Sequence, residues 1–529
     1  SGRRSLVTTK QVGMNVLSDS LFYTAYTGLE AGLVVVTADD PGMFSSQNEQ
    51  DNRHYAKLGK FPLLEPADSQ ECKDFVVKAV EISESFDTPV VVRTTMRTSH
   101  SKSVVKLGAD PAPFGDVGPF TRDMQKYNCM CLWSKQRHPV LEQRLLDLAT
   151  FSDTFPWNRI EWGDRNMGII ASGVVYEYAR QVFPDASILK LGMTFPLPKK
   201  LIQEFADGVK KLIVIEELDP FIEEQVRAMG INAIGKEIFP PCDELLPQTI
   251  QSLAEKHHLL PERTNAVPFQ SSLSDLPGRS PVLCAGCPHR STFFLLNKMK
   301  LPVAGDIGCY NLGTLPPFNA QHTMGSMGAS IGVLHGMGKS NLPEPAVCTI
   351  GDGTFFHAGI PPLLNMVHNH GRGTVIIMDN ATTAMTGHQP HPGVDMQQLQ
   401  MDGFGRVSIE AVVRAVGVPH VTLVKPYKVK KSIEAIRAAI DFKGVSVIIS
   451  HETCSLYAKS LKLARRKPFE VTDKCRNHRD CMDNLACPAF YVWNERIKID
   501  PNLCTGCAVC AQVCPENAIL PLKEKKVTA

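Results

Sequence analysis

The sequence lacks the features that mark membrane, exported and nucleic-acid-binding chains. It contains no run of about 18 apolar residues and no signal peptide, so we expect neither a membrane span nor secretion. Its 529 residues carry a formal net charge of only +2, which gives no sign of a nucleic-acid or membrane-surface partner. Apart from two cysteine runs near its end, it shows no internal repeat and no low-complexity tract. We therefore expect a cytoplasmic protein.

Disulfides are not expected either, although the sequence has 16 cysteines. A secreted disulfide scaffold would be smaller and denser in cysteine. Here seven cysteines crowd between Cys475 and Cys514, and Cys284 and Cys287 form a further close pair. Clustering of this kind in a chain without export signals indicates metal ligands.

What is present is a repeated α/β pattern. Residues 32–40 and 88–95 are short apolar strands, and residues 69–86 form an amphipathic helix between them. Strand, glycine turn and helix follow in that order at residues 166–183 and again at 211–230. Such alternation predicts an α/β fold of several doubly wound, parallel-sheet domains.

Two polar segments divide this pattern. Residues 151–166 are polar and aromatic, and residues 261–281 are rich in proline and serine, so both are interpreted as linkers. The cysteine-rich end of the chain is short and separate. We expect three α/β domains and a small C-terminal ferredoxin-like α+β domain, at residues 1–150, 166–260, 282–465 and 470–522.

Polar residues follow two buried strands of the third domain. Gly351, Asp352 and Gly353 end the strand AVCTI, and Asn380 ends the next strand, TVIIMDN. The carboxyl ends of parallel strands meet at one edge of a sheet, where such sheets bind ligands. Carboxylate and amide oxygens suit Mg²⁺, and the glycines let the backbone approach a diphosphate. The alternative is a tight strand–helix turn followed by an ordinary loop asparagine.

This arrangement resembles the thiamine diphosphate motif, in which a spacer of this length separates Gly-Asp-Gly from Asn. The resemblance implies that Mg²⁺ is bound by Asp352, by Asn380 and by the carbonyl of Thr382. It also implies that the cofactor lies at the carboxyl edge of the sheet in the third domain.

The last cysteine run has the spacing of bacterial ferredoxins. Its cysteines are Cys504, Cys507, Cys510 and Cys514, and Pro515 follows the last of them. In that fold the fourth cysteine of each run ligates the cluster of the other run. The sequence therefore predicts two [4Fe–4S] clusters with exchanged fourth ligands.

The first run departs from the pattern at one position. It supplies Cys475, Cys481 and Cys487, but His478 stands where a cysteine is expected. Cys487 should join the first three cysteines of the other run, and Cys514 should join Cys475 and Cys481. We expect His478 at the remaining vertex, because imidazole replaces cysteine in some clusters and raises their potential. The rivals are a [3Fe–4S] cluster with His478 nearby and an empty site with three free thiols.

Four cysteines of the third domain form a further candidate site. They are Cys284, Cys287, Cys309 and Cys454. Four cysteines from one domain can ligate one [4Fe–4S] cluster, which would be the third in this chain. Zinc and buried free thiols are the competing interpretations.

Five stretches, spread over nearly the whole chain, carry one further resemblance. They are ADDPGMFSSQNEQDNRHYAK (38–57), CAGCPHR (284–290), GDIGCYNLG (305–313), HTMGSMGASIGVLHGMGK (322–339) and MDNATTAMTGHQPHPG (378–393). Together they are similar to the α subunit of indolepyruvate:ferredoxin oxidoreductases. In that family an arylpyruvate such as indolepyruvate loses CO₂, coenzyme A takes the acyl group and ferredoxin is reduced.

The resemblance implies partners and domain types as well. A smaller β subunit completes the enzyme, and sites of this kind lie between domains or subunits, so we expect an oligomer. The domain at 1–150 would be of the pyrimidine-binding type, and the domain at 166–260 would resemble the transketolase C-terminal domain. The domain at 282–465 would bind the diphosphate and Mg²⁺.

The resemblance also suggests roles for single residues. Gly308 joins the glycines that contact the cofactor. His388 and His391 are candidates for proton handling near the thiazolium, with the alternative that they only shape the loop. Arg290 is expected to pair with a substrate or cofactor anion, or to form a structural salt bridge.

Two departures from the family qualify the expected activity. The family has further N-terminal sequence, with a glutamate that contacts the aminopyrimidine, and this chain begins after it. We therefore expect an incomplete first domain and little activity from the chain alone. His478 is the second departure.

Both departures favour a runner-up, a non-catalytic electron-transfer module on a degenerate thiamine diphosphate-fold scaffold, which the intact Asp352 and Asn380 oppose. A non-redox 2-oxo acid decarboxylase is a third reading, but it would have no use for the clusters.

Overall fold

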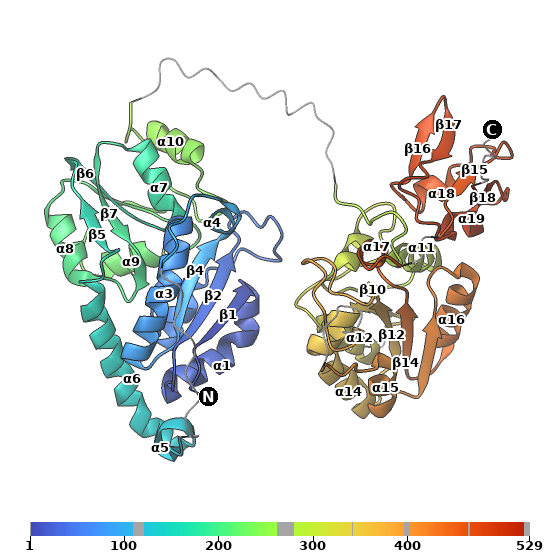
Figure 1. Ribbon diagram of the computed structural model, residues 1–529, viewed down its shortest axis with the longest axis horizontal. Coiled ribbons are helices and arrows are strands. Elements are labelled where there is room, and N and C mark those ends of the chain that lie inside the picture. The colour runs from blue at the N-terminus through green and yellow to red at the C-terminus, as the bar shows by residue number, and fades with distance from the viewer. Residues whose placement is uncertain are drawn as a thin grey trace. The chain divides into compact units, whose positions relative to one another are not determined.

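The computed structural model divides the chain into two compact units, Ser1–Gln270 and Ser271–Ala529 (Figure 1). Each unit is described by itself. Most of the second expected linker, residues 262–279, lies outside the described residues. The structure describes residues 2–108, 121–261, 280–340, 342–395, 403–463 and 466–522.

The first sheet of unit 1 has the strand order β1-β2-β4-β3-β8. Strands β1 to β4 pair in parallel, whereas β8 runs antiparallel to β3. Because β8 comes from the segment expected in the second domain, the first sheet extends beyond the domain predicted at residues 1–150. The bounds are β1 Ser5–Lys10, β2 Leu33–Asp39, β3 Leu63–Leu64, β4 Val90–Thr95 and β8 Met193–Phe195.

The second sheet of unit 1 has the order β5-β7-β6-β9. β5 is antiparallel to β7, and the other pairs are parallel. The linker interpretation of residues 151–166 was wrong for residues 159–161 and 164–166, because short polar strands give no apolar pattern. The bounds are β5 Arg159–Glu161, β6 Asp164–Ser172, β7 Ala186–Leu191 and β9 Leu212–Ile215.

The helices of unit 1 include the one predicted at residues 69–86, which is confirmed as α3. The carboxylate of Asp68 accepts a 2.8 Å hydrogen bond from the backbone N–H of Glu71 and so caps its first turn. The bounds are α1 Gly13–Thr27, α2 Arg53–Gly59, α3 Ser69–Phe86, α4 Met96–His100, α5 Met124–Tyr127, α6 Cys131–Ser152, α7 Gly173–Val182, α8 Lys199–Asp207, α9 Phe221–Ala228 and α10 Pro247–Lys256.

The two sheets of unit 1 share one apolar core. Leu63 and Val91 of the first sheet belong to the same buried cluster as Ile170 and Val214 of the second. Phe205, from α8, packs in the same cluster. Each Å² of apolar surface that this shared core removes from water contributes about 25 cal/mol to stability, so the core holds the two sheets together as one body.

Unit 2 contains a five-stranded sheet in the order β10-β11-β12-β14-β13, and all of its pairs are parallel. The predicted α/β class is confirmed by these sheets. The bounds are β10 Val303–Ala304, β11 Val347–Gly351, β12 Gly373–Asp379, β13 His420–Val424 and β14 Val445–His451.

Helices cover both faces of this sheet. Leu334, Leu363 and Val413 place α12, α14 and α15 in one apolar cluster, and Leu296 and Ile436 place α11 and α16 in another. The sheet is therefore doubly wound, as predicted. The bounds are α11 His289–Met299, a 3-10 helix Cys309–Thr314, α12 Ala329–Lys339, α13 Asp352–Thr354, a π-helix Phe355–Gly359, α14 Ile360–His368, α15 Ile409–Ala415, α16 Val429–Asp441 and α17 Ser455–Ser460.

The end of unit 2 is a small α+β body. Strand β15 pairs antiparallel with β18, and β16 pairs antiparallel with β17. Its core includes Cys481, Phe490 and Ile519, and Ala285 from the loop before α11 packs against it. The bounds are β15 Phe469–Val471, α18 Asp480–Asp483, β16 Phe490–Trp493, β17 Arg496–Ile499, α19 Val509–Val513 and β18 Ile519–Pro521.

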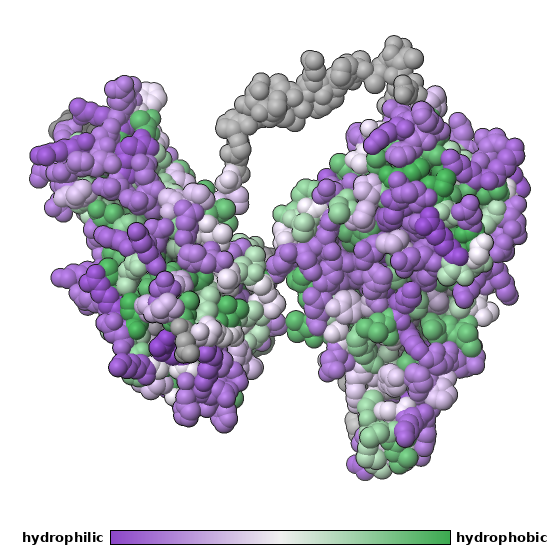
Figure 2. All heavy atoms as spheres, turned by 180° about the vertical axis from the view of Figure 1, so that it is seen from behind, coloured by the Kyte–Doolittle hydropathy of each residue, from purple (hydrophilic) through white to green (hydrophobic). Residues whose placement is uncertain are grey.

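The visible face of each unit is mostly hydrophilic (Figure 2). Apolar side chains gather at α5 and the start of α6, where Met124, Met130 and Leu132 are exposed. Among the described helices, none is both long and apolar enough to cross a bilayer.

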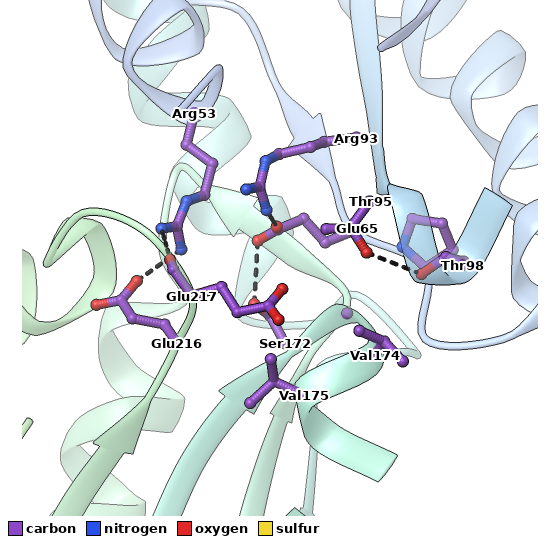
Figure 3. Close-up of a pocket in the computed structure, with 12 residues that line it drawn as sticks. Arg53, Glu65, Arg93, Thr95, Thr98, Ser172, Val174, Val175, Glu216 and Glu217 are labelled. Atoms are coloured by element: carbon purple, nitrogen blue, oxygen red, sulfur yellow. Dashed lines mark hydrogen bonds and ion pairs between the residues drawn. The ribbon is translucent and has the colours of Figure 1, made fainter. Parts of the chain in front are cut away.

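Buried charges also join the two sheets of unit 1 (Figure 3). Arg53 lies on α2, and its Nη1 donates to Oε2 of Glu216, the residue after β9 of the second sheet, over 2.6 Å. Its Nε donates to Asp51 Oδ1 over 2.9 Å. Seven charged residues meet here, each no more than 7% exposed: Arg53, Arg93, Asp39, Asp51, Glu65, Glu216 and Glu217.

The second arginine completes this network. Arg93 Nε donates to Asp39 Oδ2 over 2.6 Å, and its Nη1 donates to Glu65. Ser172, at the end of β6, donates to the other oxygen of Glu65 over 3.0 Å. A cavity of about 10 Å³, enough for one water, lies among these groups.

Carboxylates outnumber arginines in this network, and Glu217 is the least compensated of them. Its Oε1 accepts a 3.1 Å hydrogen bond from the N–H of Leu245, but no lysine or arginine in the described residues lies within ion-pair distance of it. Burial raises the pKa of Glu217 to about 7. The folded protein therefore holds a proton on Glu217 more tightly than the unfolded chain does.

We predict that Glu217→Gln stabilises the protein at pH 8 and has little effect at pH 5. The folded pKa is raised, so the contribution of Glu217 to stability is present below the unfolded value of 4.5 and is lost as the pH rises to 7. The gain in unfolding free energy should grow by about 2 to 3 kcal/mol between the two pH values. Urea unfolding at each pH measures it.

Glu224→Gln is the control, because Glu224 is an exposed glutamate on α9 of the same unit. It should leave the stability of the protein nearly unchanged at both pH values. A Glu217→Gln effect that is the same at pH 5 and pH 8 contradicts the assignment.

Candidate functional site

The polar residues predicted at the strand ends of unit 2 lie together. Asp352 follows β11 and Asn380 follows β12, and these strands are neighbours. The backbone N–H of Asn380 donates to Asp352 Oδ2 over 3.1 Å. Asp352, Asn380 and Thr382 are 3%, 7% and 2% exposed. Hard oxygen ligands are thus collected in a buried position at the carboxyl edge of the sheet.

Asp352 is held by two further contacts. The backbone N–H of Gly353 donates to its Oδ1 over 2.8 Å, and His391 Nε2 lies 3.0 Å from its Oδ2. His391 Nδ1 accepts a hydrogen bond from the N–H of Gly393, so in the neutral ring its hydrogen is on Nε2. Burial raises the pKa of Asp352 and the neighbouring His391 opposes this, with a net upward shift.

The side chain of Asn380 is oriented by His289, on the first turn of α11. Asn380 Nδ2 lies 3.3 Å from His289 Nε2, and Asn380 Oδ1 accepts from the N–H of Thr382 over 3.2 Å. Burial lowers the pKa of His289 to about 4, so this imidazole is neutral and can accept. The Oγ1 of Thr382 is buried and has no hydrogen-bond partner. The site therefore keeps an unsatisfied oxygen beside the two predicted metal ligands.

Close packing requires glycine at three positions of this edge. A Cβ on Gly351 would lie 2.7 Å from the Tyr310 ring, and one on Gly353 would lie 2.6 Å from Thr383 Oγ1. At Gly308 a Cβ would lie 2.4 Å from the same tyrosine ring. A π-helix begins at Phe355, directly after this turn, and such helices are frequent at functional sites.

The two histidines of the loop after β12 are placed differently. His391 faces Asp352, as described above. His388 has a left-handed φ of 64° and stacks on Tyr457 of α17, with ring centroids 5.7 Å apart. Its Nδ1 is buried without a hydrogen-bond partner.

Besides His289, sequence reasoning missed three residues around this site. Asp306 is fully buried and accepts hydrogen bonds from the N–H groups of Gly328 and Ser330, at the start of α12. Asp379 Oδ2 lies 2.7 Å from His451 Nδ1; burial would raise the pKa of Asp379, but this histidine outweighs it and the pKa is lowered. Asp306 stood inside the stretch GDIGCYNLG, so an acid between glycines was an available signal. The contact between Asp379 and His451 joins the ends of β12 and β14, which are far apart in sequence, so no local sequence signal pointed to it.

The four cysteines of the third domain come together beside this edge. Burial raises the pKa of Cys287 to about 12, and nearby Cys454 and Cys284 add to the effect. Burial raises the pKa of Cys309 to about 11, again with contributions from Cys454 and Cys284. The backbone N–H of Cys454 donates to the carbonyl of Asn380 over 3.0 Å. The set of four cysteines therefore borders the Asp352–Asn380 pair through the backbone of Cys454.

The spacing of these thiols does not suit a single zinc ion. Zn–S bonds of about 2.3 Å bring the sulfurs of a tetrahedral site to within about 4 Å of one another. Among the described residues, only Asp51, His54 and Asp219 bring three such ligand atoms within 4.8 Å of one another. In a [4Fe–4S] cluster each cysteine binds a different iron, so the four cysteine sulfurs lie farther apart than they do around one zinc ion.

The ferredoxin-type cysteines form two groups. Burial raises the pKa of Cys510, and the nearby thiols of Cys507, Cys487 and Cys504 raise it further. Burial raises the pKa of Cys481 to about 11, with additional effects from Cys514 and Cys475. Cys487 and Cys514 thus each lie with the cysteines of the other run.

His478 lies at the surface of this small body. Its Nε2 is 3.1 Å from Glu516 Oε1, and its side chain is 49% exposed. Asn477 and Arg479 on either side have left-handed φ values of 62° and 68°, so the backbone turns sharply around it. Ligation of iron by His478 stays a prediction.

A tight seam joins the third-domain thiols to the ferredoxin-type body. A Cβ on Gly286, which has φ +65°, would lie 1.8 Å from Thr505 Oγ1. Tyr427 donates its hydroxyl hydrogen to the carbonyl of Gly286 over 2.6 Å, and Gln512 Nε2 donates to the carbonyl of Tyr427 over 2.8 Å. The loop between Cys284 and Cys287 therefore touches the residue after Cys504.

Two family models match parts of unit 2. Residues 306–450 match the thiamine pyrophosphate enzyme C-terminal TPP binding domain, and residues 497–520 match the 4Fe-4S binding domain. The first match contains Asp352 and Asn380. Among solved structures, the 2-oxoglutarate:ferredoxin oxidoreductase from Magnetococcus marinus aligns with 36% of this chain and 70% of that chain, at 18% identity and a TM-score of 0.30.

Curated relatives match nearly the whole chain. Indolepyruvate oxidoreductase subunit IorA from Methanothermobacter thermautotrophicus is 40% identical over 98% of this chain and 87% of its own length. The subunit of the same name from Archaeoglobus fulgidus is 37% identical over 99% of this chain and 86% of its own length. The resemblance inferred from the motifs is confirmed by these relatives, and the chain belongs to the family of the indolepyruvate oxidoreductase subunit IorA.

Proposed function

We propose that the chain carries out the oxidative decarboxylation of an arylpyruvate, with indolepyruvate as the substrate named by its relatives. The acyl group passes to coenzyme A and the electrons pass to ferredoxin. The observation that carries this proposal is the hydrogen bond between Cys454 and Asn380. It places a group of four thiols directly against the edge where Asp352 and Asn380 meet, so decarboxylation and electron removal can be neighbours.

Thiamine diphosphate supplies the electron sink for decarboxylation when it is bound. In our proposal, Asp352, Asn380 and the carbonyl of Thr382 hold its Mg²⁺, and Gly308, Gly351 and Gly353 let the backbone approach its diphosphate. The buried, unsatisfied Thr382 Oγ1 and the buried oxygen-bearing side chains of Asp352 and Asn380 beside it support the fit.

The loop histidines have different roles in this proposal. His391 Nε2 lies 3.0 Å from Asp352 Oδ2 and is the histidine beside the predicted metal ligand. His388 stacks on Tyr457 and keeps an unpartnered Nδ1, so we assign it the exchange of protons near the cofactor. His289, which sequence reasoning missed, fixes the amide of Asn380.

Three clusters would remove the electrons singly. The first uses Cys284, Cys287, Cys309 and Cys454, next to the cofactor edge. The second uses Cys487 with Cys504, Cys507 and Cys510, and the third uses Cys475, Cys481 and Cys514 with His478. The proximity of the thiols in each set, seen in their effects on one another's pKa, supports metal ligation, because a cluster needs several thiolates close together.

Partners and location complete the proposal. A β subunit, ferredoxin, coenzyme A and a 2-oxo acid are the expected partners, in an oligomer of the cytoplasm. The buried Asp352–Asn380 pair disfavours a purely electron-transferring module, and the cysteine groups disfavour a non-redox decarboxylase.

The proposal is tested by arylpyruvate-dependent ferredoxin reduction with the chain assembled with its partner subunit. Indolepyruvate, phenylpyruvate and pyruvate are compared with and without coenzyme A. Reduction that needs coenzyme A and prefers the aromatic acids supports the proposal. Release of CO₂ without ferredoxin reduction would identify a non-redox decarboxylase instead.

We predict that Asp352→Ala weakens the Mg²⁺-dependent binding of thiamine diphosphate at least about 100-fold. Residues that only support a metal ligand already contribute 10- to 100-fold, and Asp352 would be a direct ligand. Titration calorimetry with thiamine diphosphate and Mg²⁺ measures the affinity. Asp441→Ala, at the exposed end of α16, is the control and should bind as the wild type does. Wild-type affinity of Asp352→Ala refutes the motif assignment.

We predict that His478→Cys lowers the reduction potential of one cluster and leaves the iron content unchanged. A thiolate in place of a neutral imidazole adds a negative charge, so the cluster is harder to reduce. Iron analysis and EPR-monitored potentiometry provide the two readouts. If His478→Ala keeps both the iron content and that potential, imidazole ligation is wrong.

A further inference from the structure

Arg290 is buried in unit 2 without an acidic partner. It belongs to the first turn of α11 and is 3% exposed. Its Nη2 donates to the carbonyls of Leu283 and Cys284, the second over 3.0 Å, and its Nη1 donates to the carbonyl of Leu485. Its Nε has no hydrogen-bond partner. Every acceptor of this guanidinium is thus an uncharged carbonyl oxygen.

A buried cation of this kind needs a counter-charge. Transfer of an unpaired charge into a protein interior costs several kcal/mol even after relaxation. Within the described ranges, no aspartate or glutamate oxygen lies within 4.0 Å of Arg290, so the expected structural salt bridge does not form; pairing with a substrate or cofactor anion stays a prediction. The Phe318 ring, 5.7 Å from Arg290 Cζ, offers only a weak cation–π contact.

The groups around Arg290 come from two cysteine sets. Cys284 and Cys287 flank it on one side, and Leu485 stands two residues before Cys487 on the other. Arg290 Nη2 donates to the carbonyl of Cys284 over 3.0 Å, and the backbone N–H of Arg290 donates to the carbonyl of Cys287 over 3.3 Å. The seam at Gly286 and Thr505 holds these two sets in contact. The guanidinium therefore lies between two groups of thiols.

We propose that Arg290 is the shared counter-charge of two iron–sulfur clusters and raises the reduction potential of both. One cluster is on Cys284, Cys287, Cys309 and Cys454, and the other is on Cys487, Cys504, Cys507 and Cys510. This inference rests on the cluster assignments of the proposed function. Thiolate-ligated clusters are anionic and gain one negative charge on reduction, so a fixed positive charge stabilises their reduced forms.

The position of Arg290 gives the proposal a directional consequence. Among the described residues, Arg290 forms no hydrogen bond with the cluster ligands Cys475, Cys481 and Cys514, whereas it bonds directly to the Cys284 carbonyl and to Leu485, near Cys487. Loss of the charge should therefore lower two potentials together and leave the third nearly unchanged. Arg290 is a positioning and tuning residue here and touches no substrate.

The test compares Arg290→Met with Arg290→Lys in the holoenzyme with its partner subunit. Both variants lose the forked hydrogen bonds to Leu283 and Leu485, but only lysine keeps the charge. EPR-monitored redox titration gives the potential of each cluster. In Arg290→Met, the one-electron reduction equilibrium of two clusters should become at least about tenfold less favourable, which is about 59 mV. In Arg290→Lys, both potentials should stay near those of the wild type.

Arg437→Met is the matched control, since Arg437 is an exposed arginine on α16 of the same unit. It should shift no potential. If Arg290→Met assembles no clusters, Arg290→Lys decides: retained iron and wild-type potentials support a charge requirement. Equal shifts in the lysine and methionine variants, loss of iron from both, or unchanged potentials in Arg290→Met overturn the proposal. Wild-type protein that lacks one of the two clusters overturns the cluster assignment itself and is recognised before any variant is made.

Discussion

A positive charge in a protein interior has to be compensated, and this constraint acts at the centre of both units. In unit 1, Arg53 and Arg93 are held by carboxylates from both sheets, so charge pairing fixes the position of one sheet against the other. In unit 2, Arg290 has only carbonyl oxygens around it and two groups of thiols beyond them. In the first network both arginines find carboxylate partners within the protein. In the second, the proposed anionic clusters would supply the missing counter-charge, which would link the fold of unit 2 to its proposed cofactors.

This constraint connects the two chemical parts of unit 2. The carboxyl edge of β11 and β12 gathers Asp352 and Asn380, and Asn380 contacts Cys454 of the first thiol group. The loop between Cys284 and Cys287 then touches Thr505 in the ferredoxin-type body. A path from the cofactor edge to the surface near His478 thus runs through directly packed elements. That arrangement explains why decarboxylation and electron transfer occupy one chain in this family.

Much of the site could be predicted because its signals are local. A buried run of β-branched residues gave β4, and amphipathic spacing gave the bounds of α3. The glycines around Asp352 and the ferredoxin-type spacing from Cys504 to Cys514 are also recognisable within a few residues. The contacts that set the chemistry are not local. His289 lies 91 positions from Asn380, and Leu485 lies 195 positions from Arg290. β8 and the polar β5 escaped prediction because strands of three residues show no periodicity.

The central claim is that decarboxylation and the clusters are coupled within this chain. The most direct measurement is EPR of the assembled enzyme, loaded with thiamine diphosphate and Mg²⁺, after arylpyruvate is added without ferredoxin. The account predicts signals of reduced clusters that appear with CO₂ release and vanish in Asp352→Ala. Release of CO₂ while the clusters stay oxidised would contradict it.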